Sequence, residues 1–277
     1  MALSRRAWLK GAAATGAAIT TGAAAYAALD RRGSLQLSRE TLSIARLPPS
    51  LSGTRIGLMT DIHHSRWVSA DDVGAAVRLL MSAQPDLIVL GGDYVTWADR
   101  AFIEPAAEAL SVLRAPHGVF AVLGNHDDDR DMTSALEARR IAVLKDRRTQ
   151  LIINGEALDL VGIRYWTRRE SEIRQVLKGA SKTVVLLAHD PRRLAEARVL
   201  NIPLVLSGHT HGGQVVLPVV GAVAARKFPV VSGSATVEHT TIFVSRGVGT
   251  VYVPVRVNCP PEVAILTLEP ARLPRDL

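Results

Sequence analysis

Five short segments of the chain carry the side-chain types that bind divalent cations. Aspartate and asparagine offer oxygen ligands and histidine offers imidazole nitrogen, a mixture that suits manganese, iron or zinc better than magnesium or calcium alone. The segments are Asp61-Ile62-His63, Gly91-Gly92-Asp93, Gly124-Asn125-His126-Asp127, His189-Asp190 and Gly208-His209-Thr210-His211-Gly212-Gly213-Gln214. Each follows an apolar run that is typical of a buried strand, so we expect the ligands to converge where strands end.

The first three segments follow a repeating pattern of strand, loop and helix. Three apolar runs lead directly into them, at residues 55–60, 87–90 and 119–123. Ser69-Ala70-Asp71-Asp72 resembles a capping box that opens a helix ending at Ser82, and a second helix is expected from about Phe102 to Arg114. Because this rhythm is typical of parallel sheet connections, the motif loops should gather at the carboxyl ends of the strands.

The second half of the chain continues this pattern and then changes. Strands are expected at 150–153, 157–163, 183–188 and 204–207, with helices near 170–178 and 192–198. After Gln214 the helical periodicity ends, and three segments are predicted to form antiparallel strands that close a second sheet, at 215–217, 240–245 and 264–268. A hydrophobic content of 48% with only 4% aromatic residues favours an aliphatic core, which suits an α/β fold of buried sheets covered by helices.

Taken in order, the five motifs resemble the metal-binding blocks of the calcineurin-like metallophosphoesterase superfamily. They match its D-x-H, G-D-x-x, G-N-H-[DE], H and G-H-x-H patterns, and the resemblance covers roughly Leu42 to Leu268. It implies an α/β fold of four layers, in which helices flank two facing mixed β-sheets and a dinuclear metal site lies at the carboxyl ends of strands. The block from Gly208 to Gln214, together with the N-terminal leader, is similar to that of an exported bacterial subgroup.

The resemblance also implies which side chains hold the two divalent cations. Asp93 would bridge both ions. The ligands that complete one site would be Asp61, His63 and His211, and those that complete the other would be Asn125, His189 and His209. Alternate residues of an extended segment point the same way, so Asp61 and His63 can address one ion. Separate ions for His209 and His211 require a bent turn, which the neighbouring glycines allow.

Three further side chains are candidates for contact with a substrate. In the resembling family, the histidine of the G-N-H-[DE] block lies near the leaving oxygen. This assigns His126 to catalysis, as a proton donor or charge stabiliser, and Asp127 to the orientation of its ring. Arg246 could reach a substrate phosphate through its guanidinium group, and a surface-loop role is an equal alternative. Three histidines outside the motifs are expected to be structural, namely His64, His117 and His239.

Residues 1–28 resemble a twin-arginine signal peptide or N-terminal anchor. Ser4-Arg5-Arg6-Ala7-Trp8-Leu9-Lys10 is followed by the uncharged stretch from Gly11 to Leu29, which is poor in Leu, Ile and Phe and would span a membrane only weakly. We therefore expect export by the twin-arginine translocase, giving a periplasmic protein or one anchored to the membrane and facing the envelope. Residues 29–52 would be a linker and first strand, and residues 53–270 the metallophosphoesterase domain.

The charge and cysteine content exclude several other classes of protein. The formal charge is +7, but the first 27 residues hold three basic residues and no acid, so their removal leaves +4. No basic run is interleaved with aromatic residues, so we expect no nucleic-acid partner. The single cysteine, Cys259, excludes an intramolecular disulfide and a cysteine zinc cluster and is expected to serve packing. The chain is expected to be a monomer.

Together these observations predict a dinuclear-metal-dependent phosphoester hydrolase, a phosphodiesterase or phosphatase. A metal-activated hydroxide would attack an envelope or lipid-linked phosphoester. One alternative is a UDP-2,3-diacylglucosamine pyrophosphohydrolase of lipid A biosynthesis, although that substrate is cytoplasmic and the leader indicates export. The other is a catalytically silent metal-binding scaffold, against which the intact motifs argue. Substrate choice would depend on four loops without a recognisable motif, at 65–71, 94–102, 165–169 and 218–238.

Overall fold

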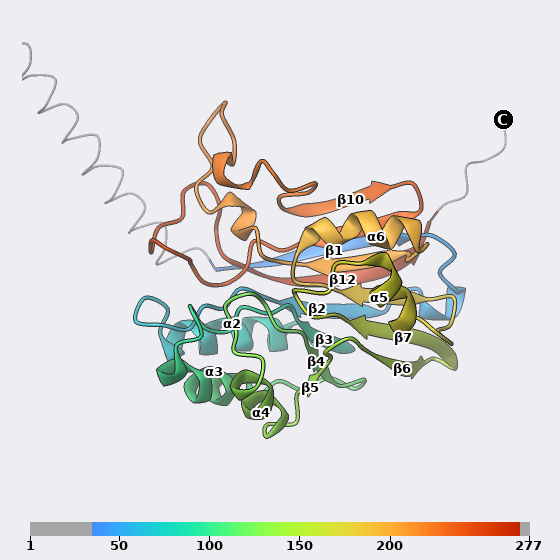
Figure 1. Ribbon diagram of the computed structural model, residues 1–277, viewed down its shortest axis with the longest axis horizontal. Helices are drawn as coiled ribbons and strands as arrows, with labels where there is room; N and C mark the ends of the chain where they lie inside the picture. The colour runs from blue at the N-terminus through green and yellow to red at the C-terminus, as the bar shows by residue number, and fades with distance from the viewer. Residues whose placement is uncertain (1–34, 272–277) are drawn as a thin grey trace, which may run out of the picture.

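The chain folds into two six-stranded β-sheets that face each other and carry helices on their outer faces (Figure 1). The computed structural model describes residues 35–271. The expected twin-arginine leader therefore lies outside the described residues. Among residues 35–271, no helix has both the length and the apolar character needed to cross a bilayer.

The first sheet combines strands from the two ends of the described chain with strands from its first half. Its order is β1 (Gln36–Ile44), β12 (Glu262–Pro270), β2 (Arg55–Met59), β3 (Leu87–Leu90), β4 (Val119–Ala121) and β5 (Ala142–Val143). Strands β2 to β5 run parallel, whereas β12 is antiparallel to β2 and parallel to β1. The carboxyl ends of β2, β3 and β4 therefore meet at one edge.

The second sheet also has a parallel centre, but its two edge strands pair antiparallel. Its order is β10 (Gly233–Val237), β11 (Thr240–Val244), β9 (Leu204–Ser207), β8 (Val184–Leu187), β7 (Glu156–Gly162) and β6 (Arg147–Ile153). Strands β11, β9, β8 and β7 are parallel, and β10 and β6 pair antiparallel at the two edges.

Two groups of helices complete the four layers. The first sheet is covered by α2 (Ala70–Ser82), α3 (Ile103–Leu110) and α4 (Asp131–Glu137), and the second by α5 (Glu170–Val176) and α6 (Leu194–Val199). Short 3-10 turns lie at η1 (Pro49–Leu51), η2 (Arg100–Phe102), η3 (Pro191–Arg193), η4 (His211–Gly213) and η5 (Val223–Ala225). The four-layer α/β arrangement predicted from the sequence is confirmed.

Burial on both faces explains why the central strands are continuous apolar runs. In β3, Leu87 and Val89 belong to the core between the two sheets, whereas Ile88 and Leu90 pack in the cluster beneath the helices. Successive side chains of a strand point to opposite faces, so a strand inside a four-layer fold needs apolar residues at every position. The predicted strand at 87–90 is reproduced without change.

The predicted start of the first helix is also confirmed. Ser69 Oγ accepts a hydrogen bond from the backbone N–H of Asp72 at 3.2 Å, and the Asp72 carboxylate accepts one from the N–H of Ser69 at 2.8 Å. These reciprocal bonds satisfy two amide groups that the first turn leaves without helical partners. The helix then begins at Ala70 and ends at Ser82.

Several expected elements differ from the structure. Residues 264–268 were expected to close the second sheet, but they belong to β12 in the first sheet, between β1 and β2. Residues 215–217 form no strand and make only isolated bridges, Val215 with Val257 and Leu217 with Gly221. The pattern also missed α4, β5 and the edge strand β10. The last of these has no buried residue, which leaves no apolar alternation to detect.

Candidate metal centre

The five motifs follow five strands whose carboxyl ends face one common space. Strands β2, β3 and β4 of the first sheet lead into the first three motifs, and β8 and β9 of the second sheet lead into the last two. Six of the seven expected ligands form two clusters there, each with its potential ligand atoms within 4.8 Å of one another. The site therefore lies between the sheets, at the edge predicted from the strand pattern.

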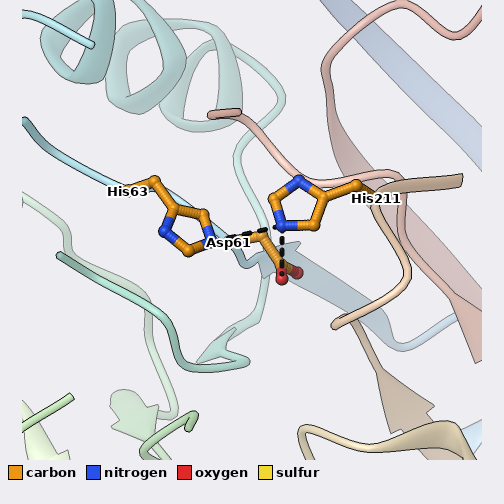
Figure 2. A group of neighbouring side chains, drawn as sticks. All are labelled: Asp61, His63 and His211. Atoms are coloured by element: carbon orange, nitrogen blue, oxygen red, sulfur yellow. Dashed lines mark hydrogen bonds and ion pairs between the residues drawn. The ribbon is translucent and has the colours of Figure 1, made fainter. Parts of the chain in front are cut away.

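The first cluster consists of Asp61, His63 and His211, all buried. His211 Nε2 lies 3.1 Å from His63 Nε2 and 3.4 Å from Asp61 Oδ1. Figure 2 shows the two imidazole rings on either side of the Asp61 carboxylate, with their Nε2 atoms turned toward each other. Two imidazole nitrogens and one carboxylate oxygen thus converge on a volume the size of a single cation.

The second cluster consists of Asp93, His189 and His209. His189 Nε2 lies 3.2 Å from Asp93 Oδ2 and 3.2 Å from His209 Nδ1. The other nitrogen of His189, Nδ1, hydrogen-bonds to the carbonyl oxygen of Gly91 at 2.7 Å. Such an outer bond fixes the orientation of a metal-binding imidazole and leaves Nε2 as the nitrogen that faces the site.

Asp93 connects the two clusters. Its Oδ2 atom is 3.2 Å from His189 Nε2 in the second cluster and 3.5 Å from His63 Nε2 in the first. Its Oδ1 atom accepts a hydrogen bond from the backbone N–H of His126 at 2.9 Å. One carboxylate oxygen thus faces both groups of ligands, which is the arrangement a bridging ligand requires.

Asn125 provides an independent test of whether these residues fit a metal ion. Its Oδ1 atom is buried and has no hydrogen-bond partner among the described residues. A buried amide oxygen without a partner is costly, because it has lost its bonds to water and gained none in return. The expected assignment of Asn125 as an oxygen ligand accounts for this atom, so the donor set fits divalent cations.

Burial keeps three of the four clustered histidines neutral, as metal ligands must be. It lowers the pKa of His63 to about 4 and that of His209 to about 3, and it holds the pKa of His211 well below its usual value. His189 differs: burial again disfavours its charge, but the Asp93 carboxylate outweighs this and raises its pKa to about 10. Without cations, Asp93 and His189 therefore form an ion pair, and binding of a cation must release the proton of His189.

Left-handed backbone conformations aim five of the ligand side chains. The residues with positive φ are Asp61 (51°), His63 (48°), Asp93 (57°), His209 (70°) and His211 (52°). Residues other than glycine rarely adopt this conformation, and each instance costs on the order of 1 kcal/mol or more. Backbone hydrogen bonds hold two of these residues in place. The N–H of Asp61 donates to the carbonyl oxygen of Gly92 at 2.9 Å, and the N–H of His63 donates to that of Asp93 at 3.0 Å. The bent turn expected at His209 and His211 is present.

Two glycines leave room for the carboxylates of the site. A Cβ atom at Gly124 would lie 2.0 Å from Asp93 Oδ1, and one at Gly208 would lie 2.1 Å from Asp61 Oδ2. Both distances are far shorter than any non-bonded contact that a real Cβ atom makes. These positions therefore need glycine because the carboxylates occupy the space of a side chain.

His126 lies beside the first cluster, with its ring centroid 5.0 Å from that of His63. The backbone N–H of Trp97 donates a hydrogen bond to Nδ1 of His126 at 3.2 Å, and the Trp97 ring packs against the imidazole. Burial lowers the pKa of His126, which favours the neutral ring. A neutral ring that accepts at Nδ1 carries its proton on Nε2.

Asp127 makes different contacts from those expected. Its carboxylate accepts hydrogen bonds from the backbone N–H groups of Asp93, Tyr94 and Gly124, each at 2.8 Å. Asp127 thus ties the second motif loop to the third, and Trp97 rather than Asp127 bonds to the His126 ring. A catalytic role for Asp127 stays a prediction, whereas its support of the loops is visible.

The Arg246 guanidinium is occupied by protein partners. Its Nη2 atom donates to Glu262 Oε2 at 2.6 Å and to Ser38 Oγ at 3.2 Å, so the side chain joins β1 and β12. The contact of Arg246 with a substrate phosphate stays a prediction that these bonds do not favour. Of the three histidines expected to be structural, buried His64 bonds through Nδ1 to the carbonyl oxygen of Val68 at 2.7 Å.

Arg256 is an important structural residue that lies outside the five metal-binding motifs. Its guanidinium is buried, and it donates to the backbone carbonyl oxygens of Gly249, Arg246 and Cys259 at 3.1, 2.8 and 3.2 Å. The N–H of Gly249 in turn donates to the carbonyl oxygen of Asp61 at 2.7 Å. Arg256 therefore holds the last loop against the first motif. In the sequence, Arg256 is the one charged residue within the otherwise apolar run at 251–257.

A cleft of about 440 Å³ opens next to the metal centre. Four aromatic side chains line it together with several polar ones, and the aromatic residues are Trp67, Trp97, Phe102 and Tyr252. Thr96, also in its wall, lies with Oγ1 3.1 Å from His63 Nδ1. The cleft has the size of a small-molecule site, and Thr96 connects its wall to His63 of the first cluster.

Substitution of Gly124 tests the steric fit around Asp93. We expect Gly124→Ala to displace the Asp93 carboxylate and abolish stoichiometric metal binding, measured as metal content after dialysis against manganese. Gly74→Ala is the matched control, because its Cβ atom would meet only the flexible end of Arg78 at 3.1 Å. That helical variant should bind metal normally and gain up to about 1 kcal/mol of stability. Retention of two ions by Gly124→Ala would disprove the steric argument.

Replacement of Arg256 tests its support of the last loop. Arg256→Met keeps the length of the side chain but leaves several buried carbonyl oxygens unpaired, so we expect a loss of about 3 kcal/mol in the free energy of unfolding. Urea denaturation measures this loss. Arg174→Met, which removes an exposed pair with Glu170 on α5, should cost about 0.5 kcal/mol or less. Equal losses in the two variants would contradict a special role for Arg256.

Comparisons with known proteins agree with this geometry. The profile of calcineurin-like phosphoesterases matches residues 54–213. The chain is 31% identical over 276 residues to the phosphodiesterase YaeI of Escherichia coli, covering 96% of this chain and 99% of that one. It is 28% identical over 280 residues to the uncharacterized metallophosphoesterase YkuE of Bacillus subtilis, covering 96% and 98%. The sulfate thiohydrolase of Thermus thermophilus shares the fold, with a TM-score of 0.51 and 13% identity over 80% of this chain and 57% of that one. The chain therefore belongs to the calcineurin-like phosphoesterase family and is a metal-dependent phosphoester hydrolase.

Proposed function

We propose that this enzyme is a phosphodiesterase and that its substrate is a lipid-linked phosphoester of the cell envelope. The observation that carries the proposal is the position of Asp93 Oδ2, which faces His63 at 3.5 Å and His189 at 3.2 Å and so joins two ligand clusters. Similarity along nearly the whole chain to a protein named a phosphodiesterase supports a diester rather than a monoester substrate.

The metal ligands position the two cations that would activate the substrate and the water. Two divalent cations, when bound, supply Lewis acidity for the phosphoryl oxygens and activate water as the nucleophile. Asp93 would hold both ions, and Asn125 adds a neutral oxygen that does not diminish the positive charge offered to the substrate. Mn, Fe and Zn all suit this mixture of oxygen and nitrogen donors.

His126 is placed to assist the departing group. Because Trp97 donates to Nδ1, the proton of the neutral ring resides on Nε2, where it can hydrogen-bond to an oxygen that gains negative charge. Its ring lies next to that of His63, so this oxygen would lie on the side of the first cluster. The adjoining cleft, lined by Trp67, Trp97 and Tyr252, would then hold an apolar part of the substrate.

Export is part of the proposal and is supported by the N-terminal sequence. The Arg5-Arg6 pair followed by an uncharged stretch suits the twin-arginine translocase, which carries folded proteins and would deliver the enzyme to the periplasm or the outer surface of the inner membrane. A UDP-2,3-diacylglucosamine pyrophosphohydrolase would need the same site but a cytoplasmic location. The assembled ligand set favours an active enzyme over a silent scaffold.

Hydrolysis of a generic diester tests the proposed activity. Manganese-loaded protein should cleave bis-p-nitrophenyl phosphate faster than p-nitrophenyl phosphate, and Asp93→Ala should reduce both rates by at least about 10³-fold because it removes the ligand shared by the two clusters. Gly74→Ala serves as a control for handling and loading. Preferential cleavage of the monoester would refute the phosphodiesterase assignment, and no cleavage of either ester would favour the scaffold.

A series of leaving groups tests His126. We expect His126→Gln to keep its metal content and to lose about 10²–10⁴-fold in kcat for a diester with an alkyl leaving group, which needs help to depart. The loss should be much smaller for bis-p-nitrophenyl phosphate, since nitrophenolate leaves without a proton. Trp97→Phe, which retains the backbone N–H to Nδ1, should show no such difference between substrates. Equal losses on both diesters for His126→Gln would exclude assistance to the leaving oxygen.

A further inference from the structure

Residues 215–231, here called the docking loop, expose several large aliphatic side chains. Val219 is fully exposed, and Leu217, Val220 and Val223 are each about half exposed. In Figure 1 this loop, in orange, extends away from both sheets. Single exposed aliphatic residues are common on protein surfaces, but a group of four on one projecting loop indicates a surface that binds something apolar.

The charges of the docking loop indicate what kind of apolar surface it meets. The loop contains Arg226 and Lys227 but no acidic residue, and no acid occurs anywhere from Val215 to Val237. Lys227 is exposed, whereas Arg226 hydrogen-bonds to the carbonyl oxygen of Val220 at 2.7 Å and so braces the tip. Aliphatic residues flanked by basic ones match a bilayer with anionic headgroups, which attract cations and accept apolar side chains.

Both ends of the docking loop are fastened to the turn that carries two of the metal ligands. The loop begins directly after Gln214, and at its other end the carbonyl oxygen of Val231 accepts a hydrogen bond from Thr210 Oγ1 at 2.6 Å. Near that end, the Phe228 ring lies 5.3 Å from the ring of His209. The loop therefore has a fixed place next to the second cluster.

A hydrogen bond connects the start of the docking loop to the segment at the mouth of the cleft. The Gln214 side chain donates to the carbonyl oxygen of Val253 at 2.9 Å, which joins the loop to the segment that exposes Tyr252 and Val253. Tyr252 in turn packs against Trp97 with ring centroids 5.6 Å apart. Tyrosine and tryptophan favour the headgroup region of a bilayer, and here they stand at the cleft beside His126.

We propose that the docking loop inserts Val219 and Val220 into the headgroup region of an anionic phospholipid bilayer and so turns the mouth of the cleft toward the membrane surface. A phosphoester between a headgroup and its lipid would then reach the metal centre without leaving the bilayer. The proposal rests on the proposed function for the identity of the substrate. The binding of the loop to lipid is a separate property that can be measured without turnover.

A fluorescent label on the loop tests insertion directly. The full-length Val219→Cys variant would carry an environment-sensitive fluorophore, since the native Cys259 is buried and escapes labelling. Vesicles of phosphatidylglycerol and phosphatidylcholine should shift its emission to the blue, and the shift should weaken in pure phosphatidylcholine and in high salt. Val199→Cys is the matched control, because Val199 is also exposed but lies on α6, outside the docking loop. Its label should not shift.

A second set of variants connects docking with turnover. Val219→Asp/Val220→Asp should lower the affinity for the anionic vesicles by roughly tenfold or more, and Lys227→Glu by roughly fivefold, while Val199→Asp leaves the affinity unchanged. Because residues 1–34 are identical in all variants, differences in affinity report on the loop. Hydrolysis of soluble bis-p-nitrophenyl phosphate should remain at the wild-type rate in each variant.

The outcomes separate the two proposals. An unshifted Val219→Cys label on the anionic vesicles, or equal affinities of the loop and α6 variants, would overturn the docking proposal whatever the activity, and would make a protein partner the better candidate for this surface. Vesicle binding through the loop without hydrolysis of any diester would leave docking intact and refute the proposed function. Loop-dependent binding together with diester hydrolysis supports both.

Discussion

The Asp93 carboxylate is the interaction on which the whole site depends. It contacts groups delivered by β2, β4 and β8, because it faces His63 and His189 through one oxygen and the His126 N–H through the other. A buried carboxylate is stable only when opposite charge compensates it. Protonated His189 provides that charge without metal, and cations would provide it in the working enzyme. The Asp93 carboxylate, from the first sheet, thus contacts His189 of the second sheet, and its negative charge must be balanced by protonated His189 or by bound cations.

The backbone, more than the side chains, fixes the geometry around this charge. Five ligand residues adopt left-handed conformations. The carboxylates of Asp93 and Asp61 occupy the positions that side chains at Gly124 and Gly208 would fill. Asp127 adds bonds from its carboxylate to the N–H groups of neighbouring loops. Strain of this kind persists only when surrounding hydrogen bonds overdetermine the conformation, and it leaves the ligands arranged before any ion arrives.

The sequence predicted the parts of this structure that depend on local pattern. The strand at 87–90 is entirely apolar and that at 204–207 is apolar up to Ser207; both are followed by polar motifs, and both were placed without error. The sheet membership of β12 was wrong, because apolar residues at consecutive positions show that both faces are buried but not which strands lie alongside. The family motifs named the residues of both clusters. The five metal-binding motifs do not include Arg256, whose partners are backbone carbonyl oxygens that any sequence supplies.

The pairing of β12 has a consequence for the order of events in biosynthesis. This strand is the last among residues 35–271, yet it lies between β1 and β2, the first two of that range, and is bonded to both. The first sheet therefore cannot close until residues 262–270 have emerged from the ribosome, although β1 and β2 are made much earlier, so its two earliest strands must wait for the partner that joins them.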